Sequence, residues 1–411
     1  MNREPQKRTG RPRARRTAVP RAAFLLPLAA TAVLAGSPAA FADGEPAVRL
    51  PVMTARLADG AGCAGPSTTT ATATPWEHRS LELSRAAPIS QGAGVTVGVV
   101  DTGVSTGAPA LAGRVDALGP AGDDCVGHGT FVAGLIAAAP VKGIAFQGIA
   151  PRARIVAVRG TDERGAPSAA GVAAGIRGAV DAGARVVQVS AAFGTRSPQL
   201  DAAVSYAVRH DVLVVAAAVP DPPSGTGGAS APAPRDYWPA ASPGVLSVLD
   251  VDVEGGRPDT ALLPVHADLA APGDAVVGIG PRGKGHFVAS GASLAAAYTA
   301  GAAALVRSAF PDLPAAGVAR RLTSTAYPDD VPRLDAYAAV ASVTDGPGTS
   351  GARTGAHEGS VRLPDRTTGE RATRTALLVS ALGAAVVLVA AWTALAVPRG
   401  RARGWHPTRR S

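Results

Sequence analysis

The sequence predicts an α/β domain built on a mainly parallel β-sheet, followed by one membrane-spanning helix near the C-terminus. Short β-branched runs alternate with helical stretches between about Gly94 and Val340, and the runs are mainly apolar, as in strands covered on both faces. In such sheets, sites form where strands end and helices begin. The predicted strands are Val95–Val100, Ile155–Arg159, Val186–Ser190 and Val212–Ala217, and the predicted helices include Ala169–Ala182 and Leu200–Arg209.

The C-terminal helix is predicted from Thr375–Val397, which is 23 residues long and carries no charge. That length is enough to cross a bilayer. Residues 398–411 follow with five arginines, so we expect a basic cytoplasmic tail by the positive-inside rule. Residues 344–374 are rich in Gly, Ser, Thr and charge, which is typical of a flexible linker.

The N-terminus predicts export. A basic segment leads into the apolar stretch Ala22–Gly36 and then an Ala-x-Ala sequence ending at Ala42, so residues 1–42 are interpreted as a secretory signal peptide. The alternative is a buried core helix. The Arg15-Arg16 pair leaves the choice between the general and the twin-arginine export route open. With one C-terminal anchor, the predicted arrangement is a single-pass type I protein of the cell membrane, whose body lies outside the cytoplasm.

The charge balance excludes a nucleic-acid partner. The chain of 411 residues has 40 Lys+Arg against 31 Asp+Glu, a net charge of +9 and a pI near 10.3. Residues 1–21 carry +7 of this and residues 398–411 carry +5, which leaves residues 22–397 at −3. The body is therefore mildly acidic, unlike a domain that binds phosphate backbones.

Three segments place a reactive side chain at a predicted junction. Asp101 ends a buried strand, His128 lies between two glycines before an apolar helix, and Ser293 opens an alanine-rich helix. Each has an ordinary structural interpretation, as a turn carboxylate, a packed histidine and a helix N-cap. Together they suggest acyl transfer, because a serine hydroxyl needs an imidazole to take its proton and a carboxylate to orient that imidazole. The order Asp, His, Ser is that of subtilisin.

The same segments resemble the three active-site blocks of subtilisin-type (S8) serine proteases. The resemblance covers roughly Trp76–Val340, and a signal peptide, one anchor and a short tail resemble the membrane-anchored mycosins of type VII secretion. The blocks are Val99–Gly103, His128–Gly134 and Gly291–Ala296, and the intervening matches are Gly148–Val158, Val186–Ser190, Tyr237–Val245 and Leu269–Gly273.

The resemblance implies a subtilisin-like three-layer peptidase domain at residues 76–343, after an N-terminal extension at 43–75. It implies that Asp101 orients His128, that His128 is the general base and acid, and that Ser293 attacks the peptide carbonyl. It places an extended protein or peptide substrate along a cleft lined by Ser190, Ala191 and Ala192. The implied partners are that substrate, the membrane and a type VII secretion complex.

No cofactor or metal is expected. Five histidines, at positions 78, 210, 266, 286 and 357, are scattered without the spacing of a zinc site. Asp123 and Asp124 are interpreted as an acidic surface loop rather than a cation or substrate-charge site.

The two cysteines, Cys63 and Cys125, are expected to form one disulfide, since the resemblance implies that this pair ties the N-terminal extension to the rim of the active site. The alternative is two free thiols. The bridge would close a loop of about 60 residues and contribute on the order of 3–4 kcal/mol.

One position departs from the family pattern. In subtilisins the oxyanion hole combines the backbone N–H of the nucleophile with an asparagine side chain, and here Val219-Pro220 replaces the Gly-Asn pair. Pro220 offers no side-chain donor and no N–H, and loss of that donor in subtilisin costs about 10²–10³ in kcat. Two hypotheses remain: a serine endopeptidase that is slow or takes a donor from Asp221–Ser230, and a degenerate protease acting as a scaffold or binding component.

Overall fold

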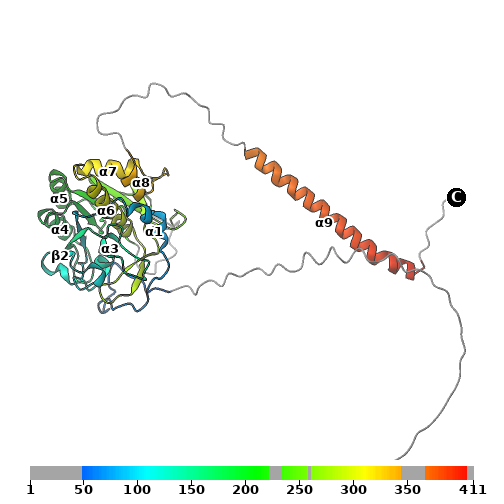
Figure 1. Cartoon of the computed structure of the whole chain (residues 1–411), viewed down its shortest axis with the longest axis horizontal. Coiled ribbons are helices and arrows are strands. Elements are labelled where there is room, and N and C mark those ends of the chain that lie inside the picture. The colour runs from blue at the N-terminus through cyan, green and yellow to red at the C-terminus, as the bar shows by residue number, and fades with distance from the viewer. Residues whose placement is uncertain (1–48, 222–232, 258–260, 344–365, 405–411) are drawn as a thin grey trace, which may run out of the picture. The chain divides into compact units, whose positions relative to one another are not determined.

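The central sheet of the domain has seven strands in the computed structural model, which describes residues 49–221, 233–257, 261–343 and 366–404 (Figure 1). The strands are β1 (Thr96–Asp101), β2 (Val115–Ala117), β3 (Arg154–Arg159), β4 (Val186–Val189), β5 (Leu213–Ala217), β6 (Val245–Val251) and β7 (Leu269–Pro272). They lie in the order β2-β3-β1-β4-β5-β6-β7, and every neighbouring pair is parallel. The predicted signal peptide at 1–42 lies outside the described residues.

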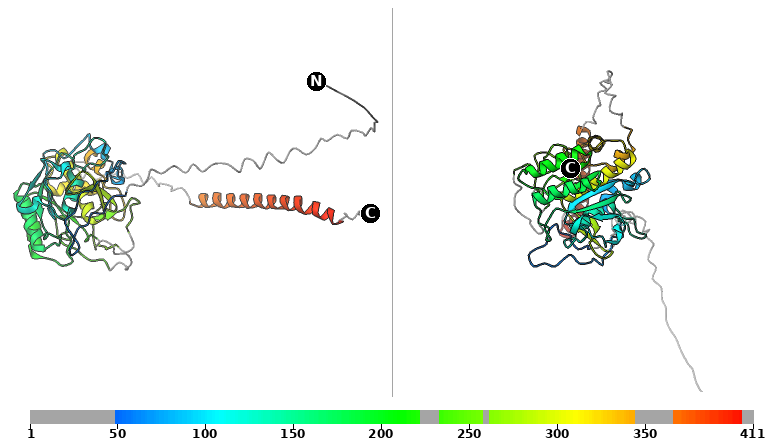
Figure 2. Two further views of the ribbon diagram at one scale, coloured as in Figure 1. Left: turned by 90° about the horizontal axis from the view of Figure 1, so that it is seen from below. Right: turned by 90° about the vertical axis from the view of Figure 1, so that its left-hand side faces the viewer.

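Helices cover both faces of this sheet. Helices α4 (Ala169–Asp181) and α5 (Pro198–Arg209) pack side by side over one face (Figure 2), and α3 (His128–Ala137) and α6 (Ala292–Ala309) cover the other. Helix α6 is buried on all sides over most of its length, because its many alanines let the sheet and α3 approach closely. The predicted three-layer α/β fold is confirmed, and the four predicted strands match within two residues at either end.

Shorter elements complete the domain, and two of them, both helices, lie beside α6. They are α1 (Trp76–Ser80), α2 (Leu83–Ala86), the 3₁₀ turns η1 (Pro109–Leu111) and η2 (Gly119–Gly122), the antiparallel hairpin of β8 (Val276–Ile279) and β9 (His286–Ala289), α7 (Ala315–Ser324) and α8 (Ala336–Ala341). Helices α7 and α8 both pack on α6.

The N-terminal extension crosses the domain in an extended form. The Met53 N–H donates to the Val288 carbonyl, and the His286 N–H donates to the Thr69 carbonyl, so the segment meets the hairpin twice. Between these contacts the predicted disulfide, Cys63–Cys125, is present, with the two Cα atoms 4.5 Å apart. The extension is therefore fastened to the segment that leads into α3.

Helix α1 carries a buried glutamate. Glu77 Oε1 accepts hydrogen bonds from the Val277 N–H at 2.9 Å and from the Tyr298 hydroxyl at 3.4 Å, while Oε2 has no partner in the described residues. Burial, partly offset by these donors, raises the pKa of Glu77 to about 7. The fold therefore favours the protonated carboxyl over the carboxylate.

This shift predicts a pH-dependent gain from Glu77→Gln. The pKa of Glu77 is 4.5 in the unfolded chain and about 7 in the folded protein. The free energy of unfolding of wild type therefore falls as the pH rises from about 4.5 to 7, because the unfolded chain loses this proton first. A neutral amide avoids that loss, and at pH 8 we expect the free energy of unfolding to be about 3 kcal/mol higher in the variant. Urea unfolding of both proteins at pH 5 and pH 8 measures the difference.

Comparing wild type with Glu77→Gln also cancels the effect on stability of every other group that titrates equally in both proteins. His78, whose pKa burial lowers to about 4, destabilises the fold in acid equally in both. Glu82→Gln, which alters a carboxylate paired with the exposed Arg85, is the control and should change stability by less than about 1 kcal/mol at either pH. A difference between wild type and Glu77→Gln that is equal at pH 5 and pH 8 would contradict the raised pKa.

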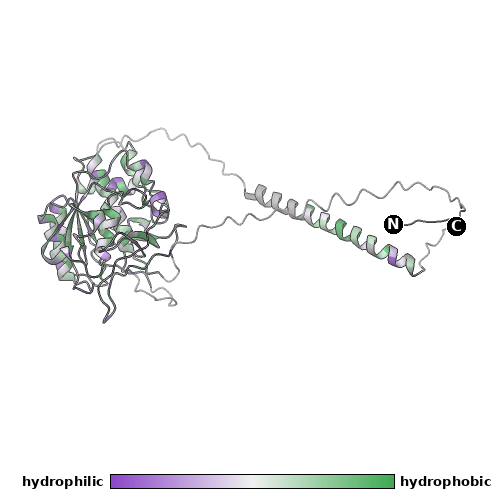
Figure 3. Cartoon of the chain, turned by 60° about the horizontal axis from the view of Figure 1, so that its bottom comes forward, coloured by the Kyte–Doolittle hydropathy of each residue, from purple (hydrophilic) through white to green (hydrophobic). Residues whose placement is uncertain are grey.

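The C-terminal helix belongs to a second compact unit, Asp345–Ser411. Helix α9 runs from Arg366 to Ala402, so residues 366–374, which the sequence predicted as linker, are helical. Within it, Leu378–Gly400 has a mean hydropathy of 2.2 and is long and apolar enough to cross a membrane. Figure 3 shows apolar residues along the middle of this helix.

Candidate active site

Asp101, His128 and Ser293 lie in a hydrogen-bonded line. His128 Nδ1 lies 2.8 Å from Asp101 Oδ2 and 3.0 Å from Oδ1, and His128 Nε2 lies 3.2 Å from Ser293 Oγ. In this arrangement a carboxylate fixes the imidazole so that its second nitrogen can take the proton of a serine. The structure thus brings together the three residues that the sequence singled out.

The sheet and two helix starts deliver these side chains. Asp101 ends β1 at the carboxyl edge of the sheet, His128 is the first residue of α3, and Ser293 is the second residue of α6. A Cβ on Gly129 would lie 2.0 Å from the Gly103 carbonyl oxygen, so only glycine lets α3 begin this close to the loop after β1. The close approach is what holds His128 against Asp101.

A cleft of about 300 Å³ opens beside the triad. Its lining includes the predicted substrate-binding residues Ser190, Ala191 and Ala192, together with Ala55 and Arg56 of the N-terminal extension. The Ser190 side chain also has a second contact, because its hydroxyl donates to Asp101 Oδ2. Ser190 therefore supports the triad carboxylate as well as bordering the cleft.

The position of the missing oxyanion donor is filled by a carboxylate. Pro220 lines the cleft, and the next residue, Asp221, extends to the nucleophile. Asp221 Oδ1 accepts the Ser293 N–H at 3.0 Å, the Ser293 hydroxyl lies 2.5 Å from Asp221 Oδ2, and His128 Nε2 lies 3.5 Å from the same oxygen. The sequence indicated only that a replacement donor could come from Asp221–Ser230, because the family motif ends at the residue that corresponds to Pro220.

The family model of the subtilases matches residues 92–366, two thirds of the chain. The chain belongs to the subtilase family. The resemblance found in the sequence is thereby confirmed.

This subtilase is similar to mycosins. It is 32% identical to Mycosin-4 of Mycobacterium tuberculosis over 373 residues, which cover 78% of this chain and 81% of the relative. It is also 32% identical to Thermitase of Thermoactinomyces vulgaris, over 56% of this chain and 81% of that one.

The solved structures that match this chain include mycosins. MycP1 from Mycobacterium smegmatis matches with a TM-score of 0.61 at 26% identity, over 74% of this chain and 97% of that structure. The MycP3 protease from the type VII (ESX-3) secretion system matches with a TM-score of 0.57 at 32% identity, over 72% of this chain and 94% of that one.

The electrostatics of this subtilase site are set by two carboxylates on either side of one imidazole. Burial lowers the pKa of His128, but Asp101 and Asp221 outweigh burial and hold that pKa well above its ordinary value. Burial raises the pKa of Asp101, yet His128, Ser190 and the Thr102 N–H outweigh it and hold the pKa low. The resting site therefore favours an imidazolium, which cannot act as a base.

Asp124 corrects an expectation. The sequence predicts an acidic surface loop at Asp123 and Asp124, and Asp123 is exposed, but Asp124 is buried, with 1% of its surface exposed. Its carboxylate accepts from the Thr102 hydroxyl at 2.9 Å, the Gly127 N–H at 2.8 Å, and the Thr130 N–H and hydroxyl at 2.8 and 2.7 Å. Asp124 thereby fixes the start of α3. These hydrogen bonds offset the free-energy cost of burying its carboxylate.

Gln188 is a second residue that the sequence did not single out as part of the site. It lies on β4, is fully buried, and its amide donates to the Ser190 hydroxyl at 3.0 Å and to the Ser293 carbonyl at 3.2 Å. It therefore links the sheet to the nucleophile's helix. A polar residue inside an otherwise apolar strand was the only signal available for it.

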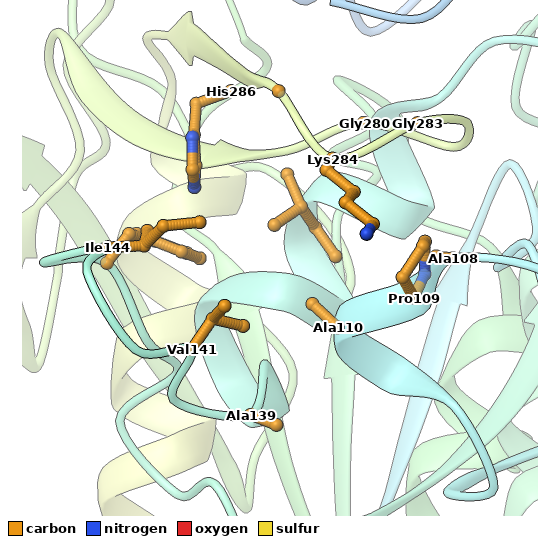
Figure 4. A pocket seen from close by; sticks show the side chains of 13 residues that line it. Ala108, Pro109, Ala110, Ala139, Val141, Ile144, Gly280, Gly283, Lys284 and His286 are labelled. Carbon is orange, nitrogen blue, oxygen red and sulfur yellow. The ribbon is translucent and has the colours of Figure 1, made fainter. Parts of the chain in front are cut away.

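A second cavity lies between η1, the segment that follows α3 and the β8–β9 hairpin, and has a volume of about 280 Å³ (Figure 4). Its walls are mainly apolar, with Val141, Ile144 and Ile279 among them, and its polar side chains are Lys284 and His286. It shares no lining residue with the cleft beside the triad.

Proposed function

We propose that this chain is a membrane-anchored, extracytoplasmic serine endopeptidase that acts within a type VII secretion complex. The observation that carries the peptidase assignment is the line from Asp101 through His128 to Ser293, with 2.8 and 3.2 Å between successive side chains. The apolar part of α9 supports the anchor. Two similar proteins of known structure support the complex: the serine protease MycP1, an essential component of the type VII (ESX-1) secretion system, and the MycP3 protease from the type VII (ESX-3) secretion system.

The proposed chemistry is acyl transfer. Ser293 Oγ forms a bond to the carbonyl carbon of the substrate, its proton passes to His128 Nε2, and the carbonyl electron pair becomes an oxyanion. His128 then returns the proton to the departing amine as the peptide bond breaks, and water releases the acyl group by the same steps. Asp101 holds the imidazole so that Nε2 faces Ser293.

The second candidate is a catalytically degenerate subtilase that serves as a scaffold or binding component. The observation that favours it is Asp221, whose carboxylate accepts the Ser293 N–H at a nucleophile that has no exposed surface. The two candidates differ in whether Ser293 can react at all.

Covalent labelling separates the candidates. Full-length protein in detergent is treated with a fluorophosphonate–rhodamine probe between pH 4 and pH 9, and labelled protein is counted by gel fluorescence. We expect labelling of wild type in part of this range and none of Ser293→Ala, while Ser308→Ala, at another serine of α6, labels like wild type. A folded wild-type protein that stays unlabelled at every pH would favour the scaffold.

A further inference from the structure

Asp221 occupies the place where an oxyanion would bind. An oxyanion-hole donor lies 2.7–3.1 Å from the developing O⁻, and the Ser293 N–H lies 3.0 Å from Asp221 Oδ1. The seat is shaped for this carboxyl group, because a Cβ on Gly291 would come within 2.1 Å of the same oxygen. The carboxyl side chain is 10% exposed. A substrate carbonyl must therefore displace Asp221 Oδ1 from the Ser293 N–H before it can be attacked.

The proton on Asp221 decides what the residue does there. An ionised carboxylate repels an oxyanion and holds the site closed, whereas a protonated carboxyl group donates a hydrogen bond, as a buried aspartic acid does in ketosteroid isomerase. We propose that Asp221 is the second oxyanion donor of this peptidase in its protonated form and a built-in inhibitor in its ionised form. The inference rests on the proposed peptidase function.

In the proposed active state, a single proton that His128 and Asp221 share lies on Asp221. His128 Nε2 and Asp221 Oδ2 are 3.5 Å apart, so one proton can lie on either of them at the same net charge. With the proton on His128, the base is blocked and the carboxylate closes the oxyanion position. With the proton on Asp221, the base is free and the donor is present. Loss of this proton, or gain of a second, stops the reaction.

The charged groups that surround Asp221 in the described part of the chain are two carboxylates and two cations. The carboxylate of Asp250 on β6 repels it, and the nearby cation Arg257 is paired with Asp250 at 2.8 Å. Asp101 lies on the far side of His128. From the start of α6, Gly291 and Ser293 present only backbone and a hydroxyl group. Among the described residues, His128 is the only cationic group within 4.0 Å of the Asp221 carboxyl oxygens.

In the proposed step, Ser293 Oγ bonds to the carbonyl carbon and gives its proton to His128 Nε2. The carbonyl electron pair moves onto oxygen, and this oxyanion accepts the Ser293 N–H and the Asp221 O–H. The Asp221 proton stays on Asp221 throughout. Collapse of the intermediate returns the electron pair to the carbonyl and passes the His128 proton to the leaving amine.

Asp221→Asn and Asp221→Ala test the proposal in full-length protein in detergent. Cleavage of the oxidised insulin B chain is followed by mass spectrometry from pH 4 to pH 9, with fluorophosphonate labelling in parallel. We expect wild-type cleavage to be fastest where the His128–Asp221 pair carries one proton and to fall on either side of that pH. Asp221→Asn should gain about 10²–10³ in kcat/KM at pH 8, with its maximum moved to more alkaline pH. Pro220→Asn, which leaves the carboxylate in place, should give no comparable gain.

The alanine variant isolates the role of the proton. It removes the obstacle and the donor together, so at the pH of the wild-type maximum we expect wild type to exceed Asp221→Ala by at least about tenfold. Equal or higher activity of Asp221→Ala at every pH would overturn the donor role. A wild-type profile that rises to an alkaline plateau, with no gain in Asp221→Asn, would overturn the inference while the peptidase function stands. If no variant cleaves or labels at any pH although each is folded, both fail together.

Discussion

Asp101→Asn is expected to lower the rate of Ser293 acylation about 10⁴-fold. Asp101 holds the proton of the neutral His128 on Nδ1, leaving Nε2 free to take the serine proton, and an amide at this position stabilises the other tautomer. In this protein Asp221 strengthens the effect, because its carboxylate lies 3.5 Å from Nε2 and favours a proton there. The rate constant of fluorophosphonate labelling at the wild-type optimum pH measures the loss.

Asp116→Asn is the matched control for this change. It removes one carboxylate of an exposed ion pair with Arg154 and should leave the labelling rate within a factor of two. Circular dichroism of each variant checks that the fold is retained. Labelling of Asp101→Asn at more than a tenth of the wild-type rate would exclude Asp101 as the residue that orients His128.

Removal of the disulfide is expected to have the largest effect on stability. The Cys63→Ser, Cys125→Ser double variant loses a bridge between residues 62 apart in sequence, which in the chain-entropy model stabilises by on the order of 3–4 kcal/mol. The melting temperature should fall by on the order of 10 °C. Scanning calorimetry of full-length protein in detergent provides the measurement.

A reductant gives the matched comparison. Wild type treated with a phosphine reductant should melt at the temperature of the double variant, and the double variant should not respond. The variant removes only the covalent link, since the backbone hydrogen bond from the Ala64 N–H to the Cys125 carbonyl does not depend on it. An unchanged melting temperature in both cases would show that these contacts alone hold the extension.

The layers of the fold could be predicted because they depend on local pattern. Apolar β-branched runs such as Val186–Val189 have few stable alternatives to buried strands, and alternation with helices forces parallel pairing. The triad could be predicted for a related reason: Asp101 and His128 sit where a strand ends and a helix begins, and such points gather at one edge of a parallel sheet.

Asp124 and Gln188 could not be predicted in this way. Each makes a hydrogen bond to a segment outside its own element, with Asp124 reaching Thr102 across 22 positions and Gln188 reaching Ser293 across 105. Whether a polar side chain is buried or exposed depends on whether the folded chain supplies partners for it, and local sequence carries no record of partners so far away.

The sequence by itself determined the family, the order of the catalytic groups and the loss of the usual asparagine at Pro220. Only the tertiary structure decided what replaces that asparagine. The backbone at the end of β5 sends Asp221 across to the first turn of α6, where Gly291 leaves room for its carboxyl group beside the Ser293 N–H. Asp221 lies one residue after the place of the family's asparagine in the sequence. Its carboxyl group still reaches the oxyanion position, because that position is defined by the Ser293 N–H and not by a place in the sequence motif.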